Sequence, residues 1–447
     1  MYPGLIIAAP GSAHGKTTVT LGLLRHLTRS GIAVAPFKVG PDYIDPAFHA
    51  AAAARPCPNL DPWAMRTETL AAAVALGGDA ALHLVEGVMG LFDGAALPGP
   101  LATTPEGHLP DGSTAHVAQL SGWPVVLVMD VRAQAGSAAA VVRGFATHRP
   151  GVNLVGVIFN RVGSATHAET LRTAMAGSGL DIPVLGCLPR EDALEIPHRH
   201  LGLVQAEEHP ALEAFLDAAA DRIAAHVDVG RLRSLARPWI GTAATGPLAP
   251  LPPLGQRIAL ARDAAFAFAY PLVLAGWHSV GAEILPFSPL ADEGPAADAD
   301  AVYLPGGYPE LHAGRLAGNT RFLEAMRAAA AQGATIYGEC GGYMVLGNGI
   351  EDADGQRHGM TGLLGLETSF ARRRLSLGYR QVAAIAASPL AQAGAVFRGH
   401  EFHYAQTISE SGTPLFRIKD AAGRARSDTG LISGTVAGSF IHLIDRA

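Results

Sequence analysis

Short apolar runs alternate along this chain with longer stretches in which apolar and polar positions repeat every three to four residues. Short apolar runs that end in small or polar residues are typical of buried parallel strands, and the longer stretches are typical of the helices that cover them. In the first half, the apolar runs occupy 5–9, 32–37, 81–85, 124–129, 154–159 and 183–189, and an amphipathic stretch at 211–226 follows them. This alternation predicts a doubly wound, mostly parallel α/β sheet.

A second α/β series follows a stretch that contains five prolines among small residues, between 237 and 255. The new apolar runs are at 258–261, 280–287, 300–304, 335–337 and 436–440. A proline-rich stretch between two such series is typical of an interdomain linker. We therefore predict an N-terminal domain at 1–236, a linker at 237–256 and a C-terminal domain at 257–447.

The first apolar run leads into a segment typical of a phosphate-binding loop, before an amphipathic stretch that begins at Val19. Backbone N–H groups of small residues and the start of a helix attract phosphate oxygens. Lys16 is expected to reach the terminal phosphates, and the Thr17 hydroxyl to ligate Mg²⁺. The first glycine of the usual motif is replaced by Pro10, and the alternative is a tight strand–helix turn. The predicted ATP-binding residues here are Gly11, Ser12, Gly15, Lys16, Thr17 and Thr18.

Polar side chains follow three other predicted strands of this half. Asp42 and Asp45 come after the second strand, where they would face a nucleotide, or would simply form an Asp-Pro turn. Glu86 ends the third strand and is a candidate Mg²⁺ ligand, whereas Asp93 could be a turn former. Asn160 follows a later strand and would either read a purine edge of ATP or cap a helix.

The second half contains a strand, a sharp turn and a helix start, with Cys340 at the turn inside Gly338-Glu339-Cys340-Gly341-Gly342. A nucleophile in such an elbow needs small neighbours, and we expect the helix start to lower the pKa of its thiol. The N–H of Gly341 could point at a developing oxyanion, and Gly306-Gly307 could supply the second donor. His442 is the candidate base among 18 histidines. The alternative is a buried thiol in a glycine-rich turn.

Composition narrows the class of protein. Of 447 residues, 49% are hydrophobic and 16% are charged, and the net charge of −6 does not favour binding to nucleic acid or anionic membranes. The three cysteines are far apart, which suits a reducing compartment rather than a disulfide framework. The first residues contain no basic region of the kind that begins a secretory leader. The apolar run that follows them is far too short to span a membrane. We therefore expect a soluble, cytoplasmic protein.

Seven segments together resemble the cobyrinic acid / hydrogenobyrinic acid a,c-diamide synthases over essentially the whole chain. They are the loop at 9–18 and the segments 37–46, 86–94, 199–203, 304–311, 338–344 and 398–404. The resemblance implies an N-terminal domain like dethiobiotin synthetase and a C-terminal class I glutamine amidotransferase domain. It also implies amidation of the a and c acetate side chains of a corrin precursor with ATP, Mg²⁺ and glutamine.

The same resemblance implies a role for each matching residue. Cys340 would form the glutamyl thioester with His442 as its base and acid, and Gly307 and Gly341 would hold the oxyanion. The phosphates would be held by Lys16, Thr17 and Thr18, and the metal by Thr17, Asp45 and Glu86. The tetrapyrrole carboxylate would lie near Asp42 and Tyr43.

The sequence departs from the expected pattern at two places. Ala13 stands in the phosphate loop where many relatives have glycine, and Ile444 stands where most triad amidotransferases have glutamate, two residues after the histidine. A Cys–His dyad or an unidentified orienting group is therefore expected, and Asp445 is one candidate. The alternatives for function are cobyric acid synthase, the a,c-diamide synthase for nickel sirohydrochlorin, and a ParA-like switch ATPase. The expected partners are small molecules, with a homodimer possible.

Overall fold

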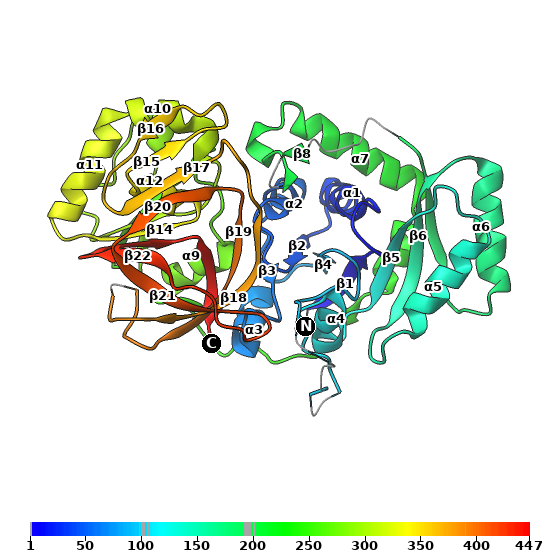
Figure 1. The fold of residues 1–447 in the computed structure, drawn as a ribbon. Coiled ribbons are helices and arrows are strands. Elements are labelled where there is room, and N and C mark those ends of the chain that lie inside the picture. Colours follow the sequence, from blue (N-terminus) through cyan, green and yellow to red (C-terminus); the bar gives the residue numbers. More distant parts are fainter. Residues whose placement is uncertain are drawn as a thin grey trace. The chain divides into compact units, whose positions relative to one another are not determined.

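A computed structural model describes residues 2–97, 99, 103–104, 107–191, 198–199, 202–388 and 390–447 (Figure 1). The chain forms two compact units, and it passes from one to the other three times. Unit 1 contains the chain up to Trp63 and Leu70–Thr245, and unit 2 contains Ala64–Thr69 and Gly246–Ala447. A short segment of the first half of the sequence thus belongs to the second unit.

Unit 1 is built on an eight-stranded sheet in the order β3-β2-β4-β1-β5-β6-β7, with parallel pairing throughout this series and β10 antiparallel to β1. This order confirms the predicted doubly wound sheet. Its strands are β1 (Pro3–Ala8), β2 (Val34–Val39), β3 (Asn59–Leu60), β4 (Leu82–Glu86), β5 (Val125–Asp130), β6 (Leu154–Val162), β7 (Val184–Pro189) and β10 (Arg237–Pro238).

Helices cover this sheet, and α1 and α7 lie side by side (Figure 1). The Arg25 side chain on α1 is 2.7 Å from the Asp217 carboxylate on α7. The helices are α1 (Lys16–Arg29), α2 (Asp45–Ala53), α3 (Thr67–Ala75), α4 (Thr114–Ser121), α5 (Ser137–Thr147), α6 (Ala165–Gly177), η2 (Ala206–Glu208), α7 (Leu212–His226) and α8 (Val229–Ser234). A hairpin of β8 (His198–Arg199) and β9 (Gly202–Leu203) falls in the motif noted at 199–203, of which His200 and Leu201 lie outside the described residues.

Unit 2 contains a ten-stranded sheet in the order β12-β11-β13-β14-β23-β22-β21-β18-β19-β24. The strands from β12 to β23 pair in parallel, as an α/β domain requires, and the pairing is antiparallel from β22 onward. Its strands are β11 (Arg257–Ala261), β12 (Glu283–Phe287), β13 (Ala301–Leu304), β14 (Thr335–Glu339), β18 (Ser376–Ala384), β19 (Val396–His403), β21 (Thr413–Asp420), β22 (Thr429–Ser433), β23 (Val436–Ser439) and β24 (Ile441–Arg446).

A smaller four-stranded sheet and six helical segments complete unit 2. The small sheet has the order β16-β15-β17-β20. These elements are β15 (Gly349–Glu351), β16 (Arg357–Gly359), β17 (Gly365–Ser369), β20 (Gln406–Ser411), α9 (Pro271–Ser279), η3 (Pro289–Ala291), η4 (Pro309–His312), α10 (Ala313–Gly318), α11 (Thr320–Ala331) and α12 (Gly341–Leu346).

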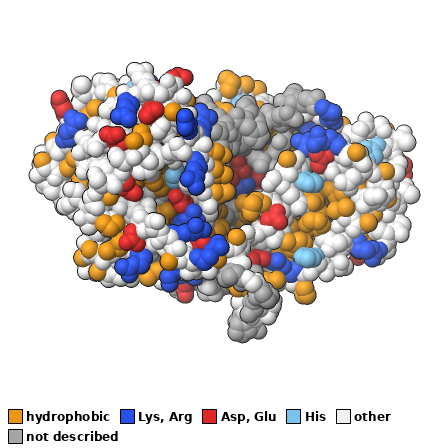
Figure 2. Space-filling view, viewed as in Figure 1, with side chains coloured by type: hydrophobic (Ala, Val, Ile, Leu, Met, Phe, Trp, Pro, Cys, Tyr) orange, Lys and Arg blue, Asp and Glu red, His pale blue; other side chains and the backbone are white. Residues whose placement is uncertain are grey.

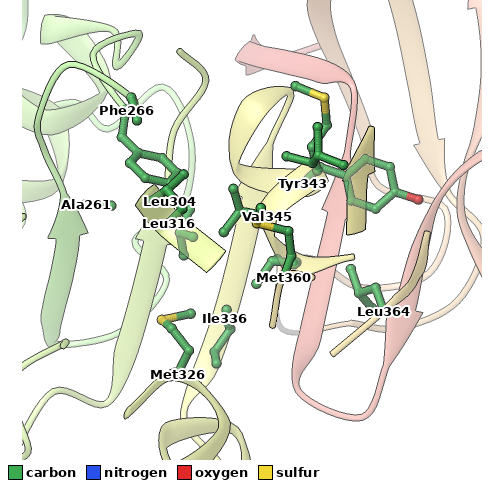
Figure 3. Close-up of a cluster of buried hydrophobic side chains, with 14 of the residues drawn as sticks. Ala261, Phe266, Leu304, Leu316, Met326, Ile336, Tyr343, Val345, Met360 and Leu364 are labelled. Atoms are coloured by element: carbon green, nitrogen blue, oxygen red, sulfur yellow. The ribbon is translucent and has the colours of Figure 1, made fainter. Parts of the chain in front are cut away.

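A buried hydrophobic cluster in unit 2 packs β14 against α12 (Figure 3). Ile336 on β14 and Val345 on α12 are fully buried, and Met326 packs into the same cluster from α11. Because the turn between β14 and α12 carries Cys340, this core fixes the position of the candidate nucleophile.

Two further observations concern the surface. On the described part of the face in Figure 2, Lys and Arg side chains lie among Asp and Glu side chains, so that this part presents no surface of a single charge sign. Among the described residues, no helix is both long enough and apolar enough to cross a membrane.

Candidate active sites

The predicted phosphate loop connects β1 to α1 in unit 1. Gly15 has a φ of 88° and Ala13 a φ of 64°, so the loop uses the left-handed region twice. Lys16 begins α1 and its Nζ donates to the Met89 carbonyl at 2.6 Å and to the Gly11 carbonyl at 3.4 Å. Burial lowers the pKa of Lys16 to about 8. The side chain thus extends across the loop, ready to exchange carbonyl partners for an anion.

Side chains at the end of β6 hold this loop from outside. Asn160 Nδ2 donates to the His14 carbonyl at 3.0 Å, and Arg161 donates to the Ala13 carbonyl at 2.7 Å. Arg161 is itself paired with Asp130 at 2.7 Å. The strand extends through Val162, so Asn160 lies within it rather than after it. In this structure Asn160 supports the loop backbone, and its contact with ATP stays a prediction.

The remaining predicted loop residues surround the start of α1. Ser12 is exposed to solvent, whereas Gly11, Thr17 and Thr18 are half-buried. Thr17 Oγ1 donates to Glu86 Oε1 at 2.7 Å. The structure therefore brings the loop together with the carboxylate that ends β4, as a shared metal site requires.

A buried cluster of charges lies at the carboxyl ends of β2 and β4. Lys38 Nζ donates to Asp45 Oδ2 at 2.6 Å and to Glu86 Oε1 at 2.9 Å. His49 on α2 is 2.6 Å from Glu86 Oε2. Lys38, Glu86 and His49 are almost completely buried. Two groups that can carry a positive charge, Lys38 and His49, thus converge on one carboxylate.

Each shifted pKa in this cluster follows from burial and the neighbouring charges. Burial opposes the charge on Lys38, but Asp45 and Glu86 outweigh it and raise the pKa of Lys38 well above its usual value. Burial also opposes ionisation of Glu86, but Lys38 and His49 outweigh it and lower the pKa of Glu86. The charge of Glu86 likewise raises the pKa of His49 against the effect of burial. Lys38 and Glu86 are therefore both charged at neutral pH.

Asp42 and Tyr43, the predicted substrate contacts, lie in the turn before α2. Asp42 Oδ1 accepts from the backbone N–H groups of Ile44 and Asp45 at 2.9 and 3.0 Å, so the turn that was an alternative for this carboxylate is present. Burial, with the nearby Asp45, raises the pKa of Asp42 to about 6. Tyr43 is buried. Asp42 thus forms the turn, and its raised pKa allows it to take up a proton close to neutral pH.

The donors that would hold Mg²⁺ are hydroxyl and carboxylate oxygens, which hard cations prefer. Thr17 Oγ1 is hydrogen-bonded to Glu86, and Asp45 Oδ2 is hydrogen-bonded to Lys38, which also donates to Glu86. Among the described residues, no group of three or more His, Cys, Asp or Glu side chains is arranged to hold a metal ion. Two carboxylates and a hydroxyl still fit Mg²⁺ when nucleotide phosphates supply other ligands.

The predicted elbow in unit 2 lies between β14 and α12. Cys340 has φ 47° and ψ −105°, a backbone conformation that costs an L-residue about 1–3 kcal/mol. Its N–H donates to the Ser439 carbonyl at 2.8 Å, and its carbonyl accepts from Met344 at 3.1 Å. The strained turn is thus held by the neighbouring strand β23 and by α12, and it presents the thiol at its apex.

His442 lies beside Cys340, although 102 positions separate them in the sequence. A Cβ atom at Gly306 would be 2.4 Å from His442 Cε1 and 3.3 Å from Cys340 Cβ, so both side chains pack on this glycine. The Gly307 nitrogen is 3.0 Å from the position of a Cβ at Gly341. The structure therefore gathers all four predicted residues, Cys340, His442, Gly307 and Gly341, around one point.

The expected low pKa of the thiol is wrong. Burial, with Glu310 as the next cause, raises the pKa of Cys340 well above its usual value, and the Gly341 N–H offsets only part of this. Burial also lowers the pKa of His442 to about 3. Both groups are consequently neutral at rest, and the proton must move from sulfur to imidazole during the reaction rather than before it.

The candidate orienting groups occupy different places. Asp445 is fully buried and accepts hydrogen bonds from Nε and Nη2 of the Arg66 guanidinium and from the Arg66 backbone N–H, so it does not orient His442. Glu339 Oε2, by contrast, is 3.9 Å from His442 Nδ1.

No role for Lys38, His49, Glu339 or Arg66 was predicted from the sequence. For Lys38 and Glu339 a signal existed, because each is a charged residue at the end of an apolar strand, where a solvated side chain is not expected. His49 and Arg66 gave no such signal, because neither lies at the end of an apolar strand. Their contacts form only when the chain folds.

Two family models match this chain: "CobQ/CobB/MinD/ParA nucleotide binding domain" over residues 5–204 and "CobB/CobQ-like glutamine amidotransferase domain" over residues 257–446. The protein named hydrogenobyrinate a,c-diamide synthase of Brucella abortus is 53% identical, with 99% of this chain and 98% of the relative covered. A protein of the same name from Rhodobacter capsulatus is 53% identical with the same coverage. One from Rhizobium meliloti is 52% identical and covers 99% of both chains.

Proposed function

The chain belongs to the hydrogenobyrinate a,c-diamide synthase family of glutamine-dependent carbon–nitrogen ligases, and on that premise we propose that it amidates the a and c acetate carboxylates of hydrogenobyrinic or cobyrinic acid in cobalamin biosynthesis, with ATP and glutamine. The observation that carries the proposal is 53% identity over 99% of the chain, spanning both candidate sites. We assign the ATP-dependent step to residues 1–236 and glutamine hydrolysis to residues 257–447.

The ATP-dependent site must turn a carboxylate oxygen into a leaving group, because ammonia does not displace it otherwise. In the proposed reaction, the substrate carboxylate attacks the terminal phosphorus of ATP, which gives an acyl phosphate and ADP. Lys16 and the loop N–H groups hold the phosphates, and Lys38 offsets the charge of the acids beside them. Thr17, Asp45 and Glu86 would hold Mg²⁺, which supplies charge neutralisation when bound.

The thiol site supplies the ammonia. Cys340 attacks the side-chain carbonyl carbon of glutamine while its proton passes to His442, and the oxyanion is held by the N–H groups of Gly307 and Gly341. His442 then protonates the leaving ammonia, and water hydrolyses the thioester. A concerted proton transfer suits the raised pKa of Cys340 and the lowered pKa of His442.

Substitution of Cys340 by alanine tests this division of labour. With ATP and hydrogenobyrinic acid, the parent is expected to form the diamide from glutamine or from ammonium salts, and Cys340→Ala from ammonium alone. Mass spectrometry of the product measures both. Diamide formation from glutamine by the variant would refute the amidotransferase role, and ATP turnover without any amide would favour a ParA-like switch ATPase.

Comparison of metal-free and cobalt-containing substrate in the same assay decides which corrin is used. If neither substrate gives product, the result would point to the alternatives, a cobyric acid synthase or a nickel-sirohydrochlorin a,c-diamide synthase. A cytoplasmic location and a homodimer stay predictions.

A further inference from the structure

We propose that Glu339, the residue directly before the nucleophile, is the positioning residue for His442 and takes the place of the glutamate that Ile444 replaces. Glu339 Oε2 lies 3.9 Å from His442 Nδ1, and both side chains are almost completely buried. The inference rests on the proposed role of Cys340 and His442 in glutamine hydrolysis.

The carboxylate of Glu339 is held in place by groups from two other strands. Its Oε2 accepts from the Tyr303 hydroxyl on β13 at 2.7 Å, and its Oε1 accepts from the Leu443 N–H on β24 at 3.1 Å. Leu443 is the residue next to His442, so the same carboxylate is tied to the backbone of the strand that carries the imidazole. Two hydrogen bonds thus hold the carboxylate beside the strand that carries the imidazole.

This position fits what a third member of a nucleophile–base pair has to do. When Cys340 passes its proton to one ring nitrogen, the imidazolium carries N–H on both nitrogens, and a carboxylate facing Nδ1 stabilises it and fixes the ring. A distance of 3.9 Å is too long for a hydrogen bond, but catalytic contacts are often long without substrate. A shift of about 1 Å would close it.

The other titratable groups around His442 do not offer this contact. His400 pairs with His442 across β19 and β24, and together with His403 it disfavours a charged His442. Tyr270 meets the ring edge-on at 6.5 Å between centroids. Asp445 is bound to Arg66. Among these groups, Glu339 is the one with a negative charge directed at Nδ1.

Ionisation of Glu339 gives the proposal a measurable signature. Burial raises the pKa of Glu339 to about 7, against the lowering effect of the Tyr303 hydrogen bond. Only the ionised form can stabilise an imidazolium, so glutamine hydrolysis should fall as pH drops below about 7. A residue that merely supports the fold would not create that dependence.

The experiment measures glutaminase kcat/KM from pH 5.5 to 9 for the parent, Glu339→Gln and Glu410→Gln. Glu410 is the matched control, because it also accepts from a buried tyrosine, the Tyr343 hydroxyl at 2.6 Å. We expect Glu339→Gln to lose kcat about 100-fold, the lower end of what a positioned proton-transfer system contributes, and to lose the acidic limb. Glu410→Gln should keep both the rate and the limb.

Tyr303→Phe is a second variant, which keeps the carboxylate and removes one of its hydrogen bonds. Because that bond lowers the pKa of Glu339, its loss should move the acidic limb to higher pH. Ammonium-dependent diamide formation should be parental in all three variants, which shows that they fold. A parental pH profile in Glu339→Gln, or an unmoved limb in Tyr303→Phe, would overturn the proposal. Failure of the Cys340→Ala test would instead overturn the proposed function itself.

Discussion

Replacement of Lys38 by methionine probes the buried charge cluster of unit 1. Methionine keeps the length and apolar stem of the side chain but removes the charge between Asp45 and Glu86. In the parent, Nζ lies 2.6 and 2.9 Å from these carboxylates and 3.9 Å from Asp42. The variant therefore leaves three neighbouring acids without their shared counter-charge.

The size of the effect follows from these distances. At an effective dielectric constant of about 20, each close contact contributes about 6 kcal/mol of attraction, much of which offsets the desolvation of the ions. Removal of one partner from a buried pair typically costs about 3–5 kcal/mol. For a unit of this size, such a loss lowers Tm by roughly 6–20 °C.

The measurement is thermal unfolding followed by circular dichroism and calorimetry at pH 5.5 and 8. Without Lys38 the acids repel one another, which raises the already raised pKa of Asp42 further and reduces the lowering of the pKa of Glu86 in the folded protein. Groups with raised carboxyl pKa values bind protons more tightly when folded, so the variant should recover stability as pH falls. The loss of Tm should accordingly be smaller at pH 5.5 than at pH 8.

Lys419→Met is the control, because Lys419 is exposed on β21 and its replacement should change stability by less than about 0.5 kcal/mol. If Lys38→Met unfolds at the parental Tm, or loses more stability at pH 5.5 than at pH 8, Lys38 is not the counter-charge of these acids.

Two glycine-related predictions test the loops of the two sites. Gly307→Ala places a Cβ 2.0 Å from the Ala265 carbonyl oxygen. We therefore expect it to lower the free energy of unfolding, measured by chemical denaturation, by about 1–3 kcal/mol and to reduce glutamine hydrolysis. Gly318→Ala is the control and should be neutral, because a Cβ there meets open space. Ala13→Gly relieves a φ of 64° and should stabilise unit 1 by up to about 1 kcal/mol in thermal unfolding; a destabilised variant would contradict the strain.

Much of the fold could be predicted from the sequence, because apolar runs and the residues that end them are local signals. The β1–loop–α1 unit and the elbow at Cys340 are read from contiguous residues, and both appear where they were expected. The antiparallel half of the unit 2 sheet was not predicted, since its strands, such as β18 and β21, expose one face and contain few continuous apolar runs.

The charges around each site could not be predicted, because they depend on residues that are distant in sequence. Glu86 meets His49 and Lys38 only when β2, β4 and α2 converge. The thiol pKa was mispredicted because the sequence suggests a helix start but hides the burial and the carboxylates, such as Glu310, that outweigh it.

The segment Ala64–Thr69 makes the two units inseparable as gene fragments. It belongs to unit 2, although the chain on both sides of it builds unit 1. A gene divided after Thr245 would yield a C-terminal polypeptide that lacks Arg66, and Asp445 would remain buried without its guanidinium. The strand bearing that carboxylate also bears His442. A domain acquired from a free-standing amidotransferase would therefore need another partner for a buried carboxylate at this position. We accordingly expect the two halves to be inherited together.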